Sequence, residues 1–168
     1  MASFGISGGG RSAEQLFREI TGAGPARRAA EADALLDGHP VEVKRATSVT
    51  LNQVRAVKYL PLVVHYAPGD EWYVIPAHVV VAAVSQKRRG QHTENPFESA
   101  TLSLNNFAAQ RIAGAHRLRS ATLQAIEESE QFPQLREAMN DVLRQSRELA
   151  DDSLRHVRAL LQTLGLGR

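Results

Sequence analysis

Asp33, Glu42 and Lys44 are the residues of this 168-residue chain whose types and spacing suit a shared chemistry. They flank the dipeptide Asp37-Gly38, which is among the strongest short-range signals for a two-residue hairpin turn. Two carboxylates on facing strands are oxygen ligands of the kind that Mg²⁺ takes from a protein. A lysine amine beside that metal would stabilise the negative charge that develops on a phosphodiester attacked by water.

The turn predicts the register of this hairpin. A two-residue loop sets residues opposite each other in the pairs Leu36–His39, Ala34–Val41, Asp33–Glu42, Ala32–Val43 and Glu31–Lys44. Asp33 then meets Glu42 in a non-hydrogen-bonded pair, in which the Cα atoms lie about 4.5 Å apart. Like charges there destabilise a sheet by up to about 1 kcal/mol, and a divalent cation between them reverses the sign.

An ordinary solvated hairpin face is the alternative interpretation of these charges. Charged residues at alternate positions are usual on such a face, where Glu31 and Lys44 would form a surface ion pair. Two features favour a functional site instead. Val41 and Val43 alternate with strand-like regularity, and Leu35 would be left on the face that is supposed to be wet.

The elements that position these residues follow from capping and periodicity. Ser12 and Gln15 predict a capped helix that ends at Gly22, and residues 47–60 predict a second helix with Thr50 as its N-cap. The other expected elements are strands over 60–66, 71–76 and 100–104, a helix over 78–86, and helices beyond residue 105. A strand, a helix and a further strand imply a right-handed crossover, so 41–44 and 62–66 should run parallel.

This order predicts an α/β core over residues 12–121, preceded by a flexible arm over 1–11 and followed by a helical extension over 122–168. Pro133 begins a long helical stretch in the extension, and Asp151-Asp152 can restart it as a separate helix. Its apolar stripe includes Leu135, Met139, Val142 and Leu149. Core packing and a dimer seam predict the same spacing, so the extension either buttresses the core or dimerises the chain.

Composition excludes several classes of protein. The chain has no cysteine, hence no disulfide framework, thiolate zinc site or cysteine nucleophile. We expect no signal peptide and no membrane segment, because the longest apolar run, around 79–84, is too short to span a bilayer, and we expect a cytoplasmic location. Residues 1–121 carry 14 basic against 10 acidic residues and residues 122–168 carry 6 against 8, a mild asymmetry that suits a polyanionic partner.

Asp33, eight intervening residues and Glu42-Val43-Lys44 resemble the signature of the PD-(D/E)XK nuclease superfamily, an Asp followed by Glu-X-Lys on a hairpin. Ala32 stands in place of the proline of the name. The helix "SAEQLF" also resembles the first helix of archaeal-type junction resolvases, with Glu14 at the acidic position. The resemblance covers residues 12–76 and implies a restriction-endonuclease-like mixed sheet flanked by helices.

The resemblance also implies roles for the residues at matching positions. Asp33, Glu42 and the Val43 carbonyl would ligate Mg²⁺, for which Mn²⁺ would substitute, and Lys44 would position the attacking water. Glu14 would lie near the metal through water, although an acidic residue in a first helical turn is favoured by the helix dipole anyway. Gln53 would lie near the scissile phosphate, although it is also the capping partner expected for Thr50.

Basic residues near these positions are candidates for phosphate contact. Three of them flank the expected site and can hold phosphates or be merely solvated: Arg45, Arg55 and Lys58. Three more follow the helix over 78–86 and can touch a DNA backbone or stabilise that helix end: Lys87, Arg88 and Arg89.

The leading expectation is a Mg²⁺-dependent endonuclease that hydrolyses DNA, as a homodimer or higher homo-oligomer whose two sites address two strands. Restriction, homing and junction-resolving activities all fit this expectation. A first alternative is a non-catalytic nucleic-acid-binding or assembly protein that retains a nuclease-like core, against which the presence of Asp33, Glu42 and Lys44 argues. A second alternative is a helical interaction protein whose function lies in residues 122–168.

Overall fold

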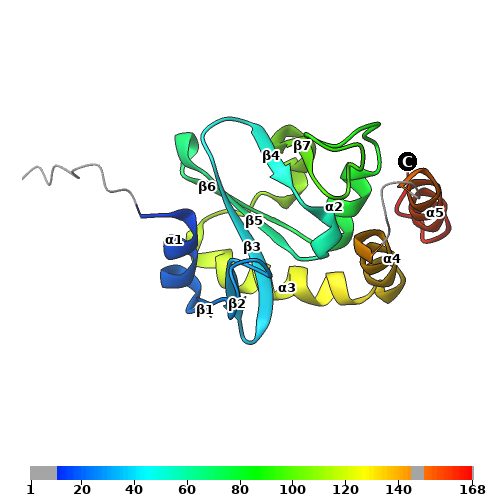
Figure 1. Cartoon of the computed structure of the whole chain (residues 1–168). Coiled ribbons are helices and arrows are strands. Elements are labelled where there is room, and N and C mark those ends of the chain that lie inside the picture. The colour runs from blue at the N-terminus through cyan, green and yellow to red at the C-terminus, as the bar shows by residue number, and fades with distance from the viewer. Residues whose placement is uncertain (1–10, 145–149, 168) are drawn as a thin grey trace, which may run out of the picture.

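The chain forms an α/β structure with a five-stranded mixed sheet, in the order β1-β2-β3-β5-β6, and a two-stranded sheet of β4 and β7 (Figure 1). The computed structural model describes residues 11–144 and 150–167, so most of the expected arm and Leu149 lie outside the described residues. The strands are β1 (Gly24–Pro25), β2 (Ala34–Leu36), β3 (His39–Ala46), β4 (Thr50–Val54), β5 (Leu62–Tyr66), β6 (Glu71–Ile75) and β7 (Ala100–Ser103). The helices are α1 (Ala13–Thr21), α2 (Ala77–Val84), α3 (Leu118–Glu130), α4 (Pro133–Arg144) and α5 (Ala150–Thr163), with short 3-10 helices η1 (Ala56–Lys58), η2 (Ala67–Gly69), η3 (Leu104–Gln110) and η4 (Ala115–Arg117).

Strand β3 lies at the centre of the main sheet and pairs in parallel with β5, as the crossover argument predicts. Side chains alternate along it, so Val41 and Val43 are buried on one face while Glu42 and Lys44 point to the other. The first face packs against α1 and α3, and the second against α2, α4 and the β4–β7 pair. Figure 1 shows α3 along one side of the main sheet and β4 with β7 along the other.

The hairpin turn between β2 and β3 is confirmed. Asp37 (φ 49°) and Gly38 (φ 82°) both have the positive φ that this two-residue loop requires. Pro40 pairs with Leu35 at a position that needs no backbone N–H within the hairpin, as the register predicts. The turn and the first three cross-strand pairs therefore follow from the local sequence.

The hairpin ladder is shorter than predicted, because it ends at the pair of Ala34 and Val41. Beyond that pair the Asp33 side chain, rather than a backbone carbonyl, accepts the N–H of Val43 at 2.8 Å, and the strand ends. The predicted backbone pairs Asp33–Glu42, Ala32–Val43 and Glu31–Lys44 are therefore wrong, and the Asp33 N–H donates to the Val41 carbonyl at 3.1 Å instead. Glu31 lies 3.7 Å from Arg28 instead.

The helix predicted within residues 47–60 is also wrong, because this segment forms β4 and η1. A bulge interrupts the pairing of β4, so that two of its residues oppose one residue of β7. The pairs that flank the bulge are three residues apart on β4 and two apart on β7: Leu51–Leu102 and Val54–Ala100. Because of the bulge, the buried residues Leu51 and Val54 are three positions apart in the sequence, which is the spacing of one face of a helix.

The C-terminal helices pack on the chain's own core, α4 on η1 and α5 on α4. Seven side chains of their apolar stripe are buried there: Leu135, Ala138, Met139, Val142, Leu154, Val157 and Leu161. The stripe therefore buttresses the core, and these side chains do not form a dimer seam. In the described ranges, no helix has the length and apolar run needed to cross a membrane.

Helix does not continue unbroken beyond residue 105, contrary to the prediction. After η3 the chain runs extended, with Arg111 bridged to Tyr73 and the Ile112 N–H donated to the Trp72 carbonyl at 3.0 Å. Arg111 also pairs with Glu71 of β6 at 2.9 Å. This segment therefore lies along the outer edge of β6 and pairs with it before α3 begins.

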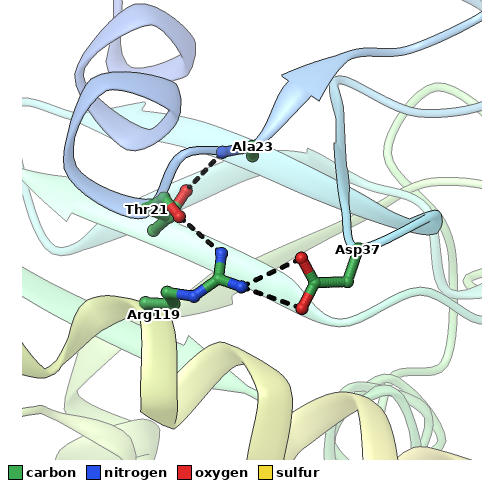
Figure 2. Close-up of polar contacts among 4 residues, drawn as sticks. All are labelled: Thr21, Ala23, Asp37 and Arg119. Atoms are coloured by element: carbon green, nitrogen blue, oxygen red, sulfur yellow. Dashed lines mark hydrogen bonds and ion pairs between the residues drawn. The ribbon is translucent and has the colours of Figure 1, made fainter.

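Arg119 of α3 joins the end of α1 to the hairpin turn (Figure 2). Its Nη1 donates to the Thr21 carbonyl at 2.6 Å, and its Nη2 lies 2.9 Å from each carboxylate oxygen of Asp37. The Thr21 hydroxyl accepts the N–H of Ala23 at 3.2 Å and closes the turn after α1. One side chain thus fixes α1 relative to the hairpin.

Candidate functional site

Asp33 immediately precedes β2 and lies near two other carboxylates, Glu42 of the central strand β3 and Glu14 of α1. Beside the effect of burial, the charge of Asp33 and a side-chain hydrogen bond to it raise the pKa of both glutamates. Its Oδ2 accepts the Val43 N–H at 2.8 Å. The structure therefore brings Asp33 near Glu42, although not in the backbone pair that the register predicts.

Two of these carboxyl groups are hard to ionise. Burial raises the pKa of Glu42, Lys58 opposes the rise, and Asp33 adds to it. Partial burial also raises the pKa of Glu14, the charge of Asp33 contributes next, and Arg18 opposes it. Burial and the nearby Asp33 therefore both disfavour the ionised form of these two glutamates in the absence of a further cation.

The Val43 carbonyl faces the same side of β3 as Asp33. In the parallel ladder the Glu42 N–H donates to the Pro61 carbonyl at 3.1 Å, so the backbone groups of Glu42 point to β5. Those of the next residue, Val43, point away from β5 because successive residues of a strand alternate. The Val43 N–H reaches Asp33 in this direction, and its carbonyl follows the same direction.

Glu42 and Lys44 open into a pocket of about 390 Å³ between the main sheet and β4. The pocket is lined by Glu42, Lys44, Gln53, Val54, Arg55, Leu60, Leu62, Val80, Gln91, His92, Glu98 and Ser99. The Lys44 amine has no hydrogen bond or ion pair with the part of the chain that the structure describes. It is therefore available to an anion in the pocket.

Lys58 also reaches the site, although it lies on η1. Its amine is 2.5 Å from Glu42 Oε1, and the two side chains are only 17% and 18% exposed. Lys58 therefore contacts a proposed metal ligand directly rather than flanking the site as a surface cation. The sequence analysis missed this contact because it placed Lys58 in a helix.

Gln53 lines the pocket from the bulge of β4, and its expected role as a capping partner for Thr50 is wrong. Its φ of 55° is uncommon for a residue with a side chain, and such strain is concentrated at functional sites. The Gln53 N–H donates to Gln91 Oε1 at 2.6 Å. The strained turn is thus held by the opposite wall of the pocket.

The loop between α2 and β7 forms that wall and contributes Gln91 and His92 to the pocket lining. A Cβ on Gly90 would come within 2.6 Å of the Asn95 carbonyl oxygen, so only glycine fits this fold of the loop. The Asn95 side chain accepts the Phe97 N–H at 2.9 Å, and Phe97 is fully buried. Gly90 with the turn-forming "ENPF" could have indicated an ordered loop.

The remaining basic candidates are distributed around the site. Arg55 lines the pocket, and its Nε donates to the Glu98 carbonyl at 3.3 Å. Arg45 is exposed and lies on the opposite face of β3 from Lys44, so it does not flank the pocket. Lys87, Arg88 and Arg89 lie beyond α2, where the Lys87 carbonyl accepts a hydrogen bond from Arg158 at 3.0 Å.

The carboxylates of Glu14, Asp33 and Glu42 are oxygen ligands of the kind that a hard divalent cation binds. Within the described residues, no group of three or more histidine, cysteine, aspartate or glutamate side chains is arranged to hold a metal. Asp33 acts on the pKa of each glutamate, so the three carboxylates lie near one another. Mg²⁺ keeps several waters and takes only one or two carboxylates from a protein, so Asp33, Glu42 and the Val43 carbonyl are the groups that could hold it.

No protein-family model, no curated protein and no solved structure matches this chain. The resemblance to the PD-(D/E)XK superfamily therefore depends on the motif and on the arrangement of its residues.

Proposed function

We propose that this protein is a metal-dependent endonuclease that hydrolyses phosphodiester bonds of DNA, on a fold of the restriction-endonuclease-like type. The observation that carries the proposal is the proximity of Asp33 to Glu42, beside a pocket that both Glu42 and Lys44 line. A mostly buried carboxylate near a second one, with an unpaired lysine in the adjoining pocket, is costly for structure alone, whereas phosphodiester hydrolysis uses both kinds of group.

The metal would be held by Asp33, Glu42 and the Val43 carbonyl. When bound, Mg²⁺ supplies a Lewis acid and lowers the pKa of a coordinated water. Lys44 orients the attacking water and stabilises the additional negative charge on the phosphate. Glu14 accepts hydrogen bonds from water beside Asp33, which fixes the position of that carboxylate.

The pocket would receive the phosphate that is cleaved. Arg55 at its mouth and Lys44 within it are the cations that contact the phosphate backbone, which dominates affinity for nucleic acids. Gln53 and Gln91 form its polar wall and position the strand. Lys87, Arg88 and Arg89 lie beyond α2, outside the pocket lining, and would contact the DNA backbone farther along the strand. The proposal includes a cytoplasmic location and a homo-oligomer.

A cleavage assay with matched variants tests the proposal. Supercoiled plasmid, single strands and four-way junctions are incubated with Mg²⁺, with Mn²⁺ and with EDTA, using the wild-type protein, D33N and K44M. We expect wild-type cleavage of at least one substrate with either metal and none in EDTA. Metal-independent cleavage, or full activity in folded D33N, would refute the metal mechanism.

A further inference from the structure

The cation nearest to the proposed metal ligands is Lys58, which no signature of the hairpin includes. Its amine lies 2.5 Å from Glu42 Oε1, and both side chains are more than four-fifths buried. An ion pair that has lost most of its water costs free energy unless each partner compensates the other. Glu42 therefore depends on Lys58 for as long as no other cation is present.

The charges around Glu42 indicate what kind of ion could take the place of the Lys58 amine. Glu14, Asp33 and Glu42 lie near one another, and the cations that act on the two glutamates are Arg18 and Lys58. Among the cations of the described residues, Lys58 is the one that contacts Glu42. Its amine occupies a position beside this carboxylate that a divalent cation would also require.

The backbone around Lys58 is firmly held, so only its side chain can move easily. The preceding residue, Val57, donates its N–H to the Phe97 carbonyl at 3.0 Å. The following residue, Tyr59, is buried and donates its hydroxyl to the Ser129 carbonyl at 2.9 Å. A lysine stem has four flexible carbons and Glu42 lines the pocket, so rotation of the side chain alone would turn the amine from Glu42 toward a phosphate bound there.

We propose that Lys58 is a displaceable counter-ion: it holds Glu42 when the metal is absent and transfers its amine to a phosphate of the nucleic acid when the metal binds. This inference rests on the proposed function. The exchange makes and breaks only ionic contacts. It couples the two ligands, since the metal releases the amine that the phosphate receives, and the phosphate stabilises the amine in its new place.

Metal titrations of the free protein test this exchange. Mn²⁺ binding is measured by electron paramagnetic resonance at mildly alkaline pH, where carboxylates are ionised, for wild type, K58M, K58Q and K58R. We expect K58M and K58Q to bind Mn²⁺ at least about tenfold more tightly than wild type, because a competing charge is gone. K58R keeps the charge and should remain near wild type. R155M removes one exposed charge on α5 and should change nothing.

A second titration adds a phosphorothioate oligonucleotide that resists cleavage. The oligonucleotide should strengthen Mn²⁺ binding in wild type and do so less in K58M and K58Q, which lack the transferred amine. K58Q is included because its amide can still donate a hydrogen bond to Glu42, so this variant is expected to fold. Circular dichroism checks that both variants are folded.

Two results would overturn the inference. The first leaves the proposed function intact, and the second overturns the proposed function as well. Folded K58Q that binds Mn²⁺ no more tightly than wild type, while wild type binds metal and cleaves DNA, shows that Lys58 is only a structural partner. Absence of Mn²⁺ binding in all variants, with and without the oligonucleotide, overturns both this inference and the proposed function.

Discussion

Two contacts between a cation and a carboxylate, at opposite ends of the hairpin, are surrounded very differently. Arg119 places one nitrogen 2.9 Å from both oxygens of Asp37 and also donates to a backbone carbonyl, with side chains 43% and 53% exposed. Lys58 meets Glu42 in a nearly buried position, and Asp33 adds a second negative charge beside it. The exposed Asp37 is bound by Arg119 on both oxygens, whereas the mostly buried Glu42 has one amine contact and a second carboxylate nearby.

The difference separates a structural contact from a candidate functional one. Arg119 of α3 contacts both the end of α1 and the hairpin turn (Figure 2). This role in holding three elements together explains the contact without a ligand. The Glu42 region contains an arrangement that raises the pKa of two carboxyl groups and therefore disfavours the metal-free fold. Arrangements that cost stability are expected where a ligand needs them.

Replacing Asp33 by asparagine should have the largest effect. The amide oxygen can still accept the Val43 N–H, while the charge that a metal requires is lost. We expect the rate of DNA cleavage to fall at least about 10³-fold, since a bound metal supplies several kcal/mol to the transition state. Thermal unfolding should show equal or higher stability, and a large loss of stability would contradict the distinction.

Replacing Lys44 by methionine should reduce the cleavage rate about 10²–10³-fold, the usual effect of removing one donor to a developing negative charge. The metal ligands remain in place, so Mn²⁺ affinity should not fall. Single-turnover cleavage and a metal titration measure the two quantities. Equal losses in both would assign Lys44 to metal binding instead.

Replacing Arg119 by methionine should affect stability alone. Its contacts are partly exposed, so we expect the free energy of unfolding to fall by only about 1 kcal/mol. Urea unfolding measures this change. Metal affinity should be unchanged, because Arg119 contacts no residue of the carboxylate cluster. A tenfold change in metal affinity would show that the two regions are coupled.

The pH dependence of stability should show the smallest effect. The pKa of Glu42 is raised above its ordinary value of 4.5, so the folded protein binds more protons than the unfolded chain just above that pH. Stability of the metal-free protein should therefore fall as pH rises through this window, by about 1.4 kcal/mol for each unit of pKa difference. Urea unfolding of D33N should show a shallower fall, because burial remains but the repulsion is gone; a steeper one would contradict this cause.

The parts of the site that the sequence predicted are those set by local rules. Asp37-Gly38 dictates its turn because few residues tolerate positive φ, and the turn sets the first three pairs of the ladder. The parallel pairing of β3 and β5 is confirmed, although the segment that connects them forms β4 and η1 rather than the helix from which the pairing was predicted. The turn alone brings Asp33 near Glu42, beyond the last pair of the ladder.

The parts that the sequence did not predict depend on contacts between distant segments. The bulge in β4 imitates helical spacing, and only its pairing with β7 reveals a strand. Lys58 reaches Glu42 because η1 is positioned by the core and the loop before β7. The position of Arg45 could have been predicted, since alternation along β3 already places it on the opposite face from Lys44.

The most direct test of the account is the position of a metal ion in crystals soaked with Mn²⁺. We predict an anomalous difference peak between the carboxylates of Asp33 and Glu42, at coordination distance from both and from the Val43 carbonyl oxygen, with the Lys58 amine withdrawn from Glu42. Clear density for both carboxylates with no peak between them, or with the metal bound elsewhere, would contradict the account.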